Sequence, residues 1–455
     1  MNILFVNPPN KPFTSHAIII EPIDILNVAT YTKSLGHNVN IIDMDAKQMD
    51  LKKLNNYLAN KDFDIAVILY DYHIPLHTDL AQKNIIKISS LLKKHGSKII
   101  IGGKTATYKK QLLLFPKTPV DILISHEMEI SLKKLLELGD WDQNKLKTIN
   151  GISFWSGKNI YSTTLCEEKF DLNISPIADR SLIDLSDYID VRTILSSRGC
   201  SQRCNFCHVV GFWKMWKGKN PKAVVDEIEY LVRTCKAKKI LFLDDNAIVD
   251  KKRMIGISNE IINRKISVAL GCLGSISCFD DEMLKTMRRA GFCWIHYGIE
   301  SGDDAVLLEV NKNTNVQRII EVVKKTKDIG LRVRTSWIMD LPKTDITSLD
   351  KTINLILDLE PDEIRIHHLV IRLGSEYYKK YANGTEDWAQ YIHSDSSMTN
   401  FSLIPQEIFA KKIKQLCKEL KKRNYNFVFK PDDTDKSKGT KYVATCPLRY
   451  GLNWK

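Results

Sequence analysis

The sequence predicts an α/β protein in which an N-terminal doubly wound parallel sheet is followed by a partial (β/α)6 barrel and a small C-terminal cap. Three observations support this fold. Short β-branched runs alternate with amphipathic stretches over residues 1–140, a second alternation begins at residue 191, and 455 residues suffice for two to four domains. The expected organisation is a first domain over 1–140, a linker over 141–190, a barrel over 191–384 and a substrate or cap region over 385–455.

The first alternation contains five expected strands, separated by helical patterns at about 22–35, 78–95, 106–114 and 127–138. The strands are ILFVN, NVNIID, DIAVILY, KIIIGG and DILIS. Each ends in a polar or glycine-rich turn, as crossover units of a parallel sheet do, so a ligand site is expected at the carboxyl ends of the strands. A hairpin, TINGISFW followed by NIYS, is expected within the linker.

The second alternation contains six expected strands: RTILSS, KILFL, SVALG, WIHYGI, RVRTSWIM and EIRIHHLV. Six units are too few to close an eight-unit barrel, so an open barrel with its chemistry at the carboxyl ends of the strands is expected. The remaining chain contains one clear helical pattern, PQEIFAKKIKQLCKELKKR, and an apolar tail that we expect to fold against the barrel mouth.

Composition excludes several classes of protein. Hydrophobic residues at 44% and charged residues at 27% exclude wholesale disorder. No apolar run reaches the length of a membrane span and no basic region precedes the first strand, so a cytoplasmic location is expected. The net charge of +13 comes largely from lysines scattered over helical patterns, which makes nucleic acid an unlikely partner. All ten cysteines lie at or after Cys166, which favours reduced thiols and a metal site over a disulfide scaffold.

Three of these cysteines, Cys200, Cys204 and Cys207, form a C-x3-C-x2-C loop after the first barrel strand. Thiolates at this spacing on an irregular loop can converge on one soft metal centre. Zinc ribbons use four ligands, whereas three cysteines leave one iron of a four-iron cluster open to a cofactor. Two other interpretations remain: three ordinary buried cysteines, and a structural zinc site completed by His208.

The cysteine spacing, with Phe206 before the third cysteine, resembles the signature of radical S-adenosylmethionine (SAM) enzymes. Three further motifs resemble those of the same enzymes: FLDDN at 242–246, IHYGIESGDD at 295–304 and RLGSEYY at 372–378. The N-terminal part resembles the cobalamin-binding domain that precedes the barrel in one branch of that family, through NPP at 7–9, SLGH at 34–37, the glycine pair at 102–103 and HEME at 126–129. The resemblance covers about residues 1–380.

The resemblance implies a [4Fe–4S] cluster on the three cysteines, with SAM bound to its open iron. The expected SAM contacts are Phe206, Asp244, Asp245, Glu300, Ser301 and Arg334. The aspartates would accept hydrogen bonds from the ammonium group, Glu300 and Ser301 would bind the ribose, and Arg334 would pair with the carboxylate. The alternatives are that the aspartates cap a helix and that the other residues form structural ion pairs.

The expected cobalamin contacts are Asn7, Pro8, Gly102, Gly103 and Glu127. The two glycines would let the backbone approach the corrin ring. Some residues depart from the family pattern. DYHIPL at 71–76 lacks the final glycine of the cobalt-ligating motif and follows the wrong strand, so His73 is not expected to bind cobalt. HEME lacks an initial glycine, and Asp340 stands where a glycine is common. A domain retained as a scaffold without cobalamin therefore remains an alternative.

The implied activity is cobalamin-dependent methyl transfer to an unactivated carbon of a small molecule or peptide, with electrons from an external flavodoxin-like or ferredoxin-like donor. One alternative keeps the radical chemistry but uses it for cyclisation, rearrangement or oxidation, with or without cobalamin. Another is a basic, metal-stabilised nucleic-acid-binding protein. A second cluster on Cys272, Cys278 and Cys293 is not expected, because Cys272 and Cys293 lie within apolar strands.

Overall fold

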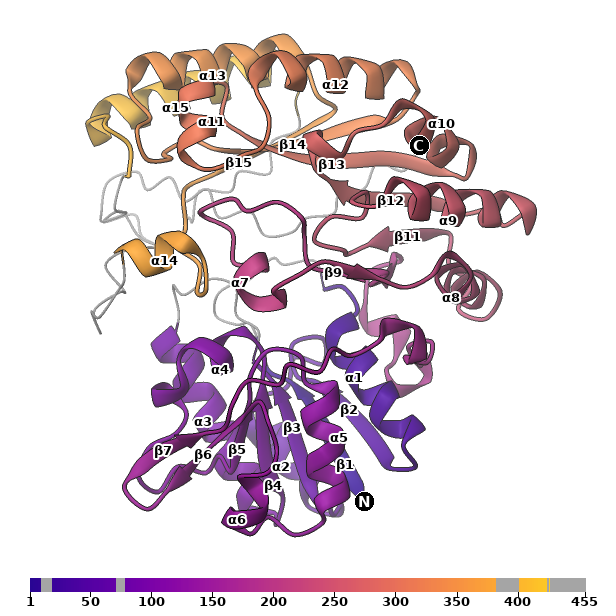
Figure 1. Ribbon diagram of the computed structural model, residues 1–455, viewed down its shortest axis with the longest axis vertical. Coiled ribbons are helices and arrows are strands. Elements are labelled where there is room, and N and C mark those ends of the chain that lie inside the picture. Colours follow the sequence, from indigo (N-terminus) through magenta and orange to yellow (C-terminus); the bar gives the residue numbers. More distant parts are fainter. Residues whose placement is uncertain (10–18, 71–77, 382–400, 424, 426–455) are drawn as a thin grey trace. The chain divides into compact units, whose positions relative to one another are not determined.

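The computed structural model describes residues 1–9, 19–70, 78–381, 401–423 and 425. The chain forms two compact units, residues 1–195 and 196–455 (Figure 1). The motif that contains His73 lies outside the described residues, as does most of the expected C-terminal region apart from its helix.

The first unit contains a seven-stranded sheet in the order β2-β1-β3-β4-β5-β6-β7. Its parallel strands are β1 (Asn2–Asn7), β2 (Asn38–Asp43), β3 (Ile65–Leu69), β4 (Lys98–Gly102) and β5 (Ile122–Ile124), and the hairpin β6 (Ile152–Ser156) and β7 (Asn159–Ser162) continues the sheet in antiparallel fashion. The hairpin expected in the linker is therefore part of the first sheet, because β6 pairs with β5.

Helices cover both faces of this sheet, as the doubly wound prediction requires. One face carries α1 (Ile23–Ser34) and α5 (Glu129–Leu138), whose Tyr31 and Ile130 share a core cluster. The other face carries α2 (Leu51–Leu58), α3 (Thr78–Lys94) and α4 (Lys104–Tyr108), which share a larger cluster with β1, β3 and β4. Because β1 to β5 are buried on both faces, they are nearly continuous apolar runs. The short helix α6 (Gln143–Leu146) precedes the hairpin.

A buried ion cluster ties the segment after the hairpin to the start of α1. The Glu21 carboxylate, which is 1% exposed, accepts hydrogen bonds from Arg192 Nη1 at 2.7 Å and Arg180 Nε at 3.4 Å. Thr193 also donates to Glu21 through its N–H and hydroxyl, both at 3.3 Å. This cluster ties Arg180, Arg192 and Thr193 to Glu21.

The second sheet has the order β15-β14-β13-β12-β11-β8, and every strand pair described within this sheet is parallel. Its strands are β8 (Arg192–Ile194), β11 (Lys239–Phe242), β12 (Ala269–Gly274), β13 (Phe292–Glu300), β14 (Arg332–Ile338) and β15 (Glu363–His367). The strands follow one another in chain order and the sheet does not close, which confirms the partial six-unit barrel.

Asn or Asp side chains begin the helices of this unit. These helices are α8 (Pro221–Arg233), α9 (Lys251–Asn263), α10 (Asp281–Arg289), α12 (Val316–Asp328) and α13 (Ile346–Leu359), capped by Asn220, Asp250, Asp280, Asn315 and Asp345. Each cap accepts the N–H of the third residue beyond it, which satisfies an otherwise unpaired donor. Shorter elements are β9 (Ser197–Arg198), α7 (Val209–Trp213), β10 (Lys217–Gly218), α11 (Asp304–Glu309) and α14 (Glu376–Tyr381), and α15 (Gln406–Lys422) is the expected C-terminal helix.

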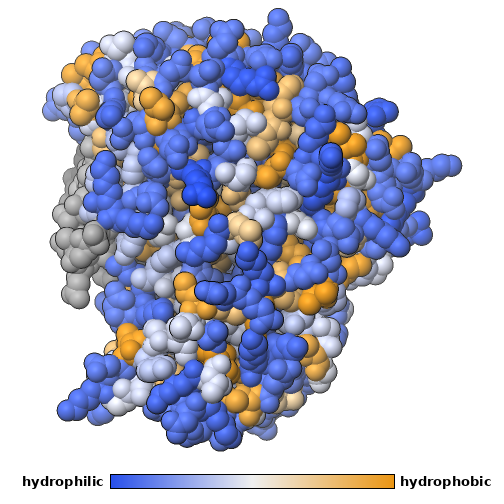
Figure 2. All heavy atoms as spheres, viewed as in Figure 1, coloured by the Kyte–Doolittle hydropathy of each residue, from blue (hydrophilic) through white to orange (hydrophobic). Residues whose placement is uncertain are grey.

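The surface agrees with the interpretation of the composition. Figure 2 shows a visible face that is mostly hydrophilic, with apolar residues scattered over it. In the described part of the chain, none of the helices has the length and apolar character needed to cross a membrane.

The Glu21 cluster generates the first prediction. Glu21→Gln should lower the free energy of unfolding by about 3 kcal/mol, because it leaves two buried guanidinium groups without their carboxylate. Urea denaturation followed by fluorescence measures the change, and hydrogen exchange of the β1 amides assigns it to the first unit. The control is Glu168→Gln, in an exposed pair with Lys134, which should cost less than about 1 kcal/mol. Equal effects of the two substitutions would contradict the role given to the cluster.

Candidate functional site

The cysteine loop lies at the carboxyl end of the barrel strands, between β9 and α7, and neighbouring backbone clamps it. Asn205 donates its N–H to Val310 O (3.0 Å) and its Nδ2 to Glu309 O (2.9 Å), at the end of α11. Asn311 Nδ2 donates to Arg203 O at 2.8 Å, and the Tyr377 N–H donates to Asn205 O at 3.0 Å. An irregular loop held from both sides in this way can present several side chains in a fixed order.

The three thiols are withdrawn from water to different degrees. Cys204 is buried, and Cys200 and Cys207 are half-buried. Burial raises the pKa of all three, and that of Cys207 to about 12. The thiols are therefore protonated at neutral pH, and binding of a metal would have to displace their protons.

Asp244, at the end of the second barrel strand, holds the chain just before this loop. It is fully buried and accepts hydrogen bonds from the Ser196 N–H (2.7 Å), the Ser196 hydroxyl (2.5 Å) and the Ser197 hydroxyl (2.7 Å). Arg253 Nη2 donates to Ser196 O at 2.7 Å and to its hydroxyl at 2.9 Å. These contacts occupy both Asp244 oxygens, so in this structure Asp244 positions the loop. Neither Asp244 nor Asp245 caps a helix, because α9 begins after Asp250.

Asp245 and Asn246 approach the loop itself. Asp245 Oδ2 accepts the Gly199 N–H at 3.0 Å. Gly199 has φ +84°, and a Cβ there would lie 2.4 Å from Met215 O, so this turn requires glycine. Asn246 Nδ2 donates to Cys200 Sγ at 3.7 Å and to Cys278 Sγ at 3.5 Å. Cys278 is thus a fourth thiol beside the loop, which its position in the sequence did not indicate.

Asn246 also presents an unsatisfied acceptor. Its side chain is 2% exposed, and its Oδ1 has no hydrogen-bond partner among the described residues. A buried carbonyl without a donor carries a desolvation cost unless a ligand supplies the donor. This oxygen is therefore better placed than Asp244 to accept from a cofactor's ammonium group.

Glu300 ends the fourth barrel strand in a left-handed conformation, with φ +76°. Its Oε1 lies 3.1 Å from Lys312 Nζ, and both side chains are at most about a tenth exposed. Burial alone would lower the pKa of Lys312, but Glu300, Cys204 and Cys207 outweigh it and the pKa is raised. Lys312 therefore remains a cation next to the cysteine loop.

The other three expected SAM contacts, Ser301, Phe206 and Arg334, already have partners within the protein. Ser301 is bonded to the Thr352 hydroxyl at 3.4 Å and accepts the Asp303 N–H at 3.2 Å. Phe206 packs against a core cluster that contains Ile371 and Tyr377. Arg334 stacks over the Trp294 ring at 4.4 Å and pairs with Glu363 at 2.5 Å, near the amino ends of β14 and β15.

Lys312 and Arg372 are two cations that act on the cysteine loop, and neither was predicted as a site residue. Burial lowers the pKa of Arg372, and Cys207 and Glu300 oppose that effect. Arg372 lies within the RLGSEYY motif at 372–378. The sequence therefore identified the motif, but not that the guanidinium group of Arg372 acts on Cys207. Lys312 carried no signal in the sequence, because only the fold brings it to Glu300.

The expected cobalamin contacts gather at the carboxyl edge of the first sheet. Asn7 ends β1, where its side chain hydrogen-bonds the buried Asp43, and Pro8 beside it is buried. Gly103 follows β4 with φ +106°, a conformation that favours glycine. A Cβ on Gly102 would lie 2.3 Å from Met128 Sδ, so this glycine makes room for Met128. Glu127 is half-buried at the turn before α5.

Two buried hydroxyls at this same edge are available to a ligand. Tyr108 OH, at the end of α4, and Ser125 Oγ, directly after β5, have no hydrogen-bond partner among the described residues. Burial raises the pKa of Tyr108, so the phenol stays protonated and can donate. Together with the positive φ of Gly103, these groups fit a polar ligand at the carboxyl edge, where parallel sheets bind their ligands.

The cysteine loop has the chemistry of a cluster site but not yet its geometry. Across the described ranges, no three or more His, Cys, Asp or Glu side chains are arranged to hold a metal ion. A cluster therefore requires the three thiols to turn toward one centre. Three soft donors on one loop with two cations beside them fit a four-iron cluster with one open position.

The chain resembles known proteins over both units. Residues 194–356 match the Radical SAM superfamily model. An uncharacterised methyltransferase from Pyrococcus horikoshii is 24% identical over 411 residues, which are 88% of each chain. An anaerobic magnesium-protoporphyrin IX monomethyl ester cyclase from Synechocystis is 23% identical and covers 83% of this chain and 77% of its own.

A solved structure resembles the whole architecture. The radical SAM methyltransferase TsrM from Kitasatospora setae, with cobalamin and a [4Fe–4S] cluster bound, gives a TM-score of 0.72 at 14% identity. The match covers 84% of this chain and 74% of that one. At this identity the likeness concerns the fold, and it confirms the expected doubly wound domain followed by a partial barrel.

The Asp244 network generates the second prediction. Asp244→Asn should lower the free energy of unfolding by about 2 to 3 kcal/mol, because the new amide group faces hydroxyls that need an acceptor. Iron retained after anaerobic reconstitution should fall as well, since the loop loses its anchor. The control is Asp281→Asn, in an exposed pair with Lys285. If both variants are equally stable and bind equal iron, Asp244 does not position the loop.

Proposed function

We propose that this chain, whose residues 194–356 match the Radical SAM superfamily model, is a cobalamin-dependent methyltransferase that acts on an unactivated carbon. The observation that carries the proposal is the domain order. A doubly wound domain precedes a partial barrel whose first loop carries three cysteines. Unpartnered buried hydroxyls lie at the carboxyl edge of the sheet in that first domain. The likeness to TsrM over most of both chains supports the same conclusion.

In this proposal Cys200, Cys204 and Cys207 hold a [4Fe–4S] cluster, which supplies the electron for cleavage of SAM when both are bound. The chain's own residues then bind and orient. Asn246 Oδ1 would accept from the ammonium group of SAM, and Lys312 or Arg372 would pair with its carboxylate. Asp244 and Asp245 would keep the loop in place through their hydrogen bonds to Ser196 and Gly199.

The carboxyl edge of the first sheet would hold cobalamin, which supplies the methyl group when bound. Gly103 would allow close approach of its ring, and Tyr108 and Ser125 would hydrogen-bond its polar groups. Asn7 would act indirectly by holding Asp43. The substrate in this proposal is a small molecule or peptide, and a flavodoxin-like or ferredoxin-like protein delivers the electrons.

A second candidate is radical cyclisation or oxidation at the same site. It is favoured by the similarity to the cyclase from Synechocystis, which covers 83% of this chain. The two candidates differ in the fate of a labelled methyl group. Methyl transfer moves the label from SAM to the product, whereas cyclisation leaves it in methionine.

The cluster assignment is tested with cysteine variants. Cys204→Ser should abolish the brown chromophore of the anaerobically purified protein and reduce iron and sulfide from about four each per chain to near background. Formation of 5′-deoxyadenosine from SAM should disappear with them. The matched control is Cys235→Ser, a half-buried thiol just after α8, which should keep chromophore and activity. A colourless zinc protein would overturn the assignment.

Cobalamin binding is tested with a pair of glycines that flank β4. Both have positive φ, +106° for Gly103 at the carboxyl edge and +92° for Gly96 at the opposite edge. Gly103→Val should lose binding of hydroxocobalamin, measured by its absorbance after gel filtration, because the branched side chain blocks approach of the ring. Gly96→Val introduces similar backbone strain away from that edge and should keep it. If the unaltered full chain binds none, the cobalamin-free alternatives are favoured.

A further inference from the structure

A pocket of about 210 Å³ lies between α15 and the carboxyl ends of β14 and β15, within the second unit. Tyr297, Thr335 and Ile364 are register partners on three neighbouring strands. The Tyr297 hydroxyl lies 3.2 Å from Thr326 of α12, so these partners face the outer layer of helices. Ile366 is two residues beyond Ile364 and points to the same side. The pocket is therefore on the outer face of the sheet, and the barrel interior lies across β15.

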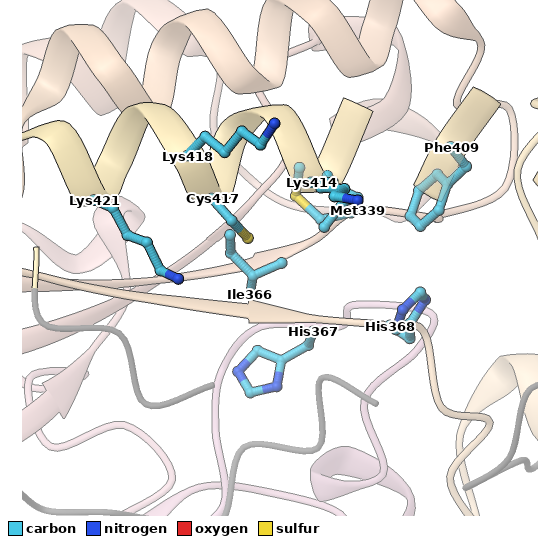
Figure 3. A pocket seen from close by; sticks show the side chains of 10 residues that line it. Met339, Ile366, His367, His368, Phe409, Lys414, Cys417, Lys418 and Lys421 are labelled. Carbon is cyan, nitrogen blue, oxygen red and sulfur yellow. The ribbon is translucent and has the colours of Figure 1, made fainter. Parts of the chain in front are cut away.

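The pocket is lined mainly by apolar side chains from α15 and from the ends of the two strands: Met339, Ile366, Phe409, Ile413 and Cys417. The first three are buried, and the last two are half-buried. Figure 3 shows Cys417 directed toward Ile366 across the pocket, with Phe409 at one end. An apolar group placed here would therefore contact the protein on both sides.

The packing of α15 leaves this space open along one side of the helix. Leu416 and Leu420 are at most 1% exposed, whereas Ile413 and Cys417, on the neighbouring row of the same helix, remain half-buried. Protein interiors are close-packed, because an unfilled gap loses the dispersion contacts of its lining. A space of about 210 Å³ is many times larger than one water needs, and an apolar lining offers water few partners. The space suits an apolar ligand group instead.

The floor at the Phe409 end is held in place, so the pocket is preformed. His368 Nδ1 lies 3.1 Å from Asp340 Oδ2, and the centroids of the His368 and Phe409 rings are 5.5 Å apart. The other Asp340 oxygen accepts the Leu369 N–H at 2.6 Å. Asp340, which departs from the family pattern, thereby fixes this histidine. His367 also borders the pocket, and burial lowers its pKa to about 4, so its ring is uncharged at neutral pH.

The rim of the pocket on α15 is basic, with three lysines along the helix: Lys414, Lys418 and Lys421. All three are exposed, and none forms an ion pair or hydrogen bond with another residue in the described ranges. By contrast, Lys412 of the same helix is paired with Asp350 of α13. Burial raises the pKa of Cys417 and the charge of Lys421 opposes that effect, which places the ammonium group near the thiol. A cationic rim thus borders an apolar space.

We propose that this pocket binds a small amphipathic anion, an apolar chain or ring that carries a carboxylate or a phosphate. The apolar part lies between Ile366 and Cys417 and extends toward Phe409, and the anionic group meets Lys414 and Lys421 at the rim (Figure 3). Burial of the apolar part supplies the affinity, and the lysines supply the preference for an anion. This binding needs neither the cysteine loop nor methyl transfer, so it and the proposed function can fail separately.

The test uses Cys417 as a reporter inside the pocket of the reduced, full-length protein. Octanoate and octyl phosphate are the probes, and alkylation of Cys417 by iodoacetamide is followed by mass spectrometry. At ten times its Kd, a bound probe should slow this alkylation about tenfold, because the reaction needs the free pocket. Cys235, a half-buried thiol just after α8, is measured in the same sample and should be unaffected. The probe with the lower Kd identifies the anionic group.

Chain length and charge should both change the affinity. Each methylene removed between octanoate and butanoate should raise the Kd about fourfold, and octan-1-ol should bind more weakly than octanoate. Lys414→Gln/Lys421→Gln should raise the Kd of octanoate about tenfold and leave that of octan-1-ol unchanged, which shows that the pocket itself is intact. The matched control is Lys411→Gln/Lys422→Gln, which removes the same charge from α15 outside the pocket and should change neither Kd.

Several outcomes would overturn the inference. They are no protection of Cys417 by either probe, equal protection of Cys235, binding of octan-1-ol as tightly as octanoate, and equal losses in the two double variants. A Cys417 thiol that is inert before any probe is added would overturn it too, because the pocket would then have another occupant, such as residues 426–455 of the same chain. Protection by phosphatidylglycerol vesicles but not by the soluble probes would assign the surface to a membrane instead.

Discussion

The site depends on one buried carboxylate that holds an irregular loop. A loop that must present three thiols cannot use regular secondary structure, so its backbone needs other partners. Asp244 provides the anchor at one end by accepting from Ser196 and Ser197, and Arg253 closes the same network from the α9 side. Because Asp244 is fully buried, each of these bonds is made without competition from water.

The thiols of this loop would become negatively charged only on binding a metal, and two buried cations lie where they would offset that charge. Lys312 and Arg372 lie beside the thiols, and the ion pair with Glu300 keeps Lys312 charged despite its burial. The positive φ of Glu300 and the bulge between Gly298 and Glu300 turn this side chain toward Lys312 at the end of its strand. Local backbone strain is thus associated with the carboxylate nearest the cysteines.

The sequence predicted the large-scale plan well, because that plan follows from periodicity. Alternating apolar runs located both sheets, and the count of six units predicted an open barrel. The linker was harder to recognise, because an antiparallel hairpin on the edge of a parallel sheet has the same local pattern wherever it packs. Among site residues, motifs identified Asp244 and Arg334 as polar groups at strand positions. They could not reveal that Asp244 is saturated by Ser196 and Ser197, or that Arg334 stacks on Trp294.

The residues that sequence reasoning missed share a physical property: their importance arises from partners distant in the chain. Asn246 matters because its amide reaches both Cys200 and Cys278, and Lys312 because α11 returns it to β13. Net charge summed over the chain does not reveal a buried ion pair such as that of Lys312 with Glu300, since solvated surface lysines dominate the +13. The informative charge is the buried part, and burial is set by the fold.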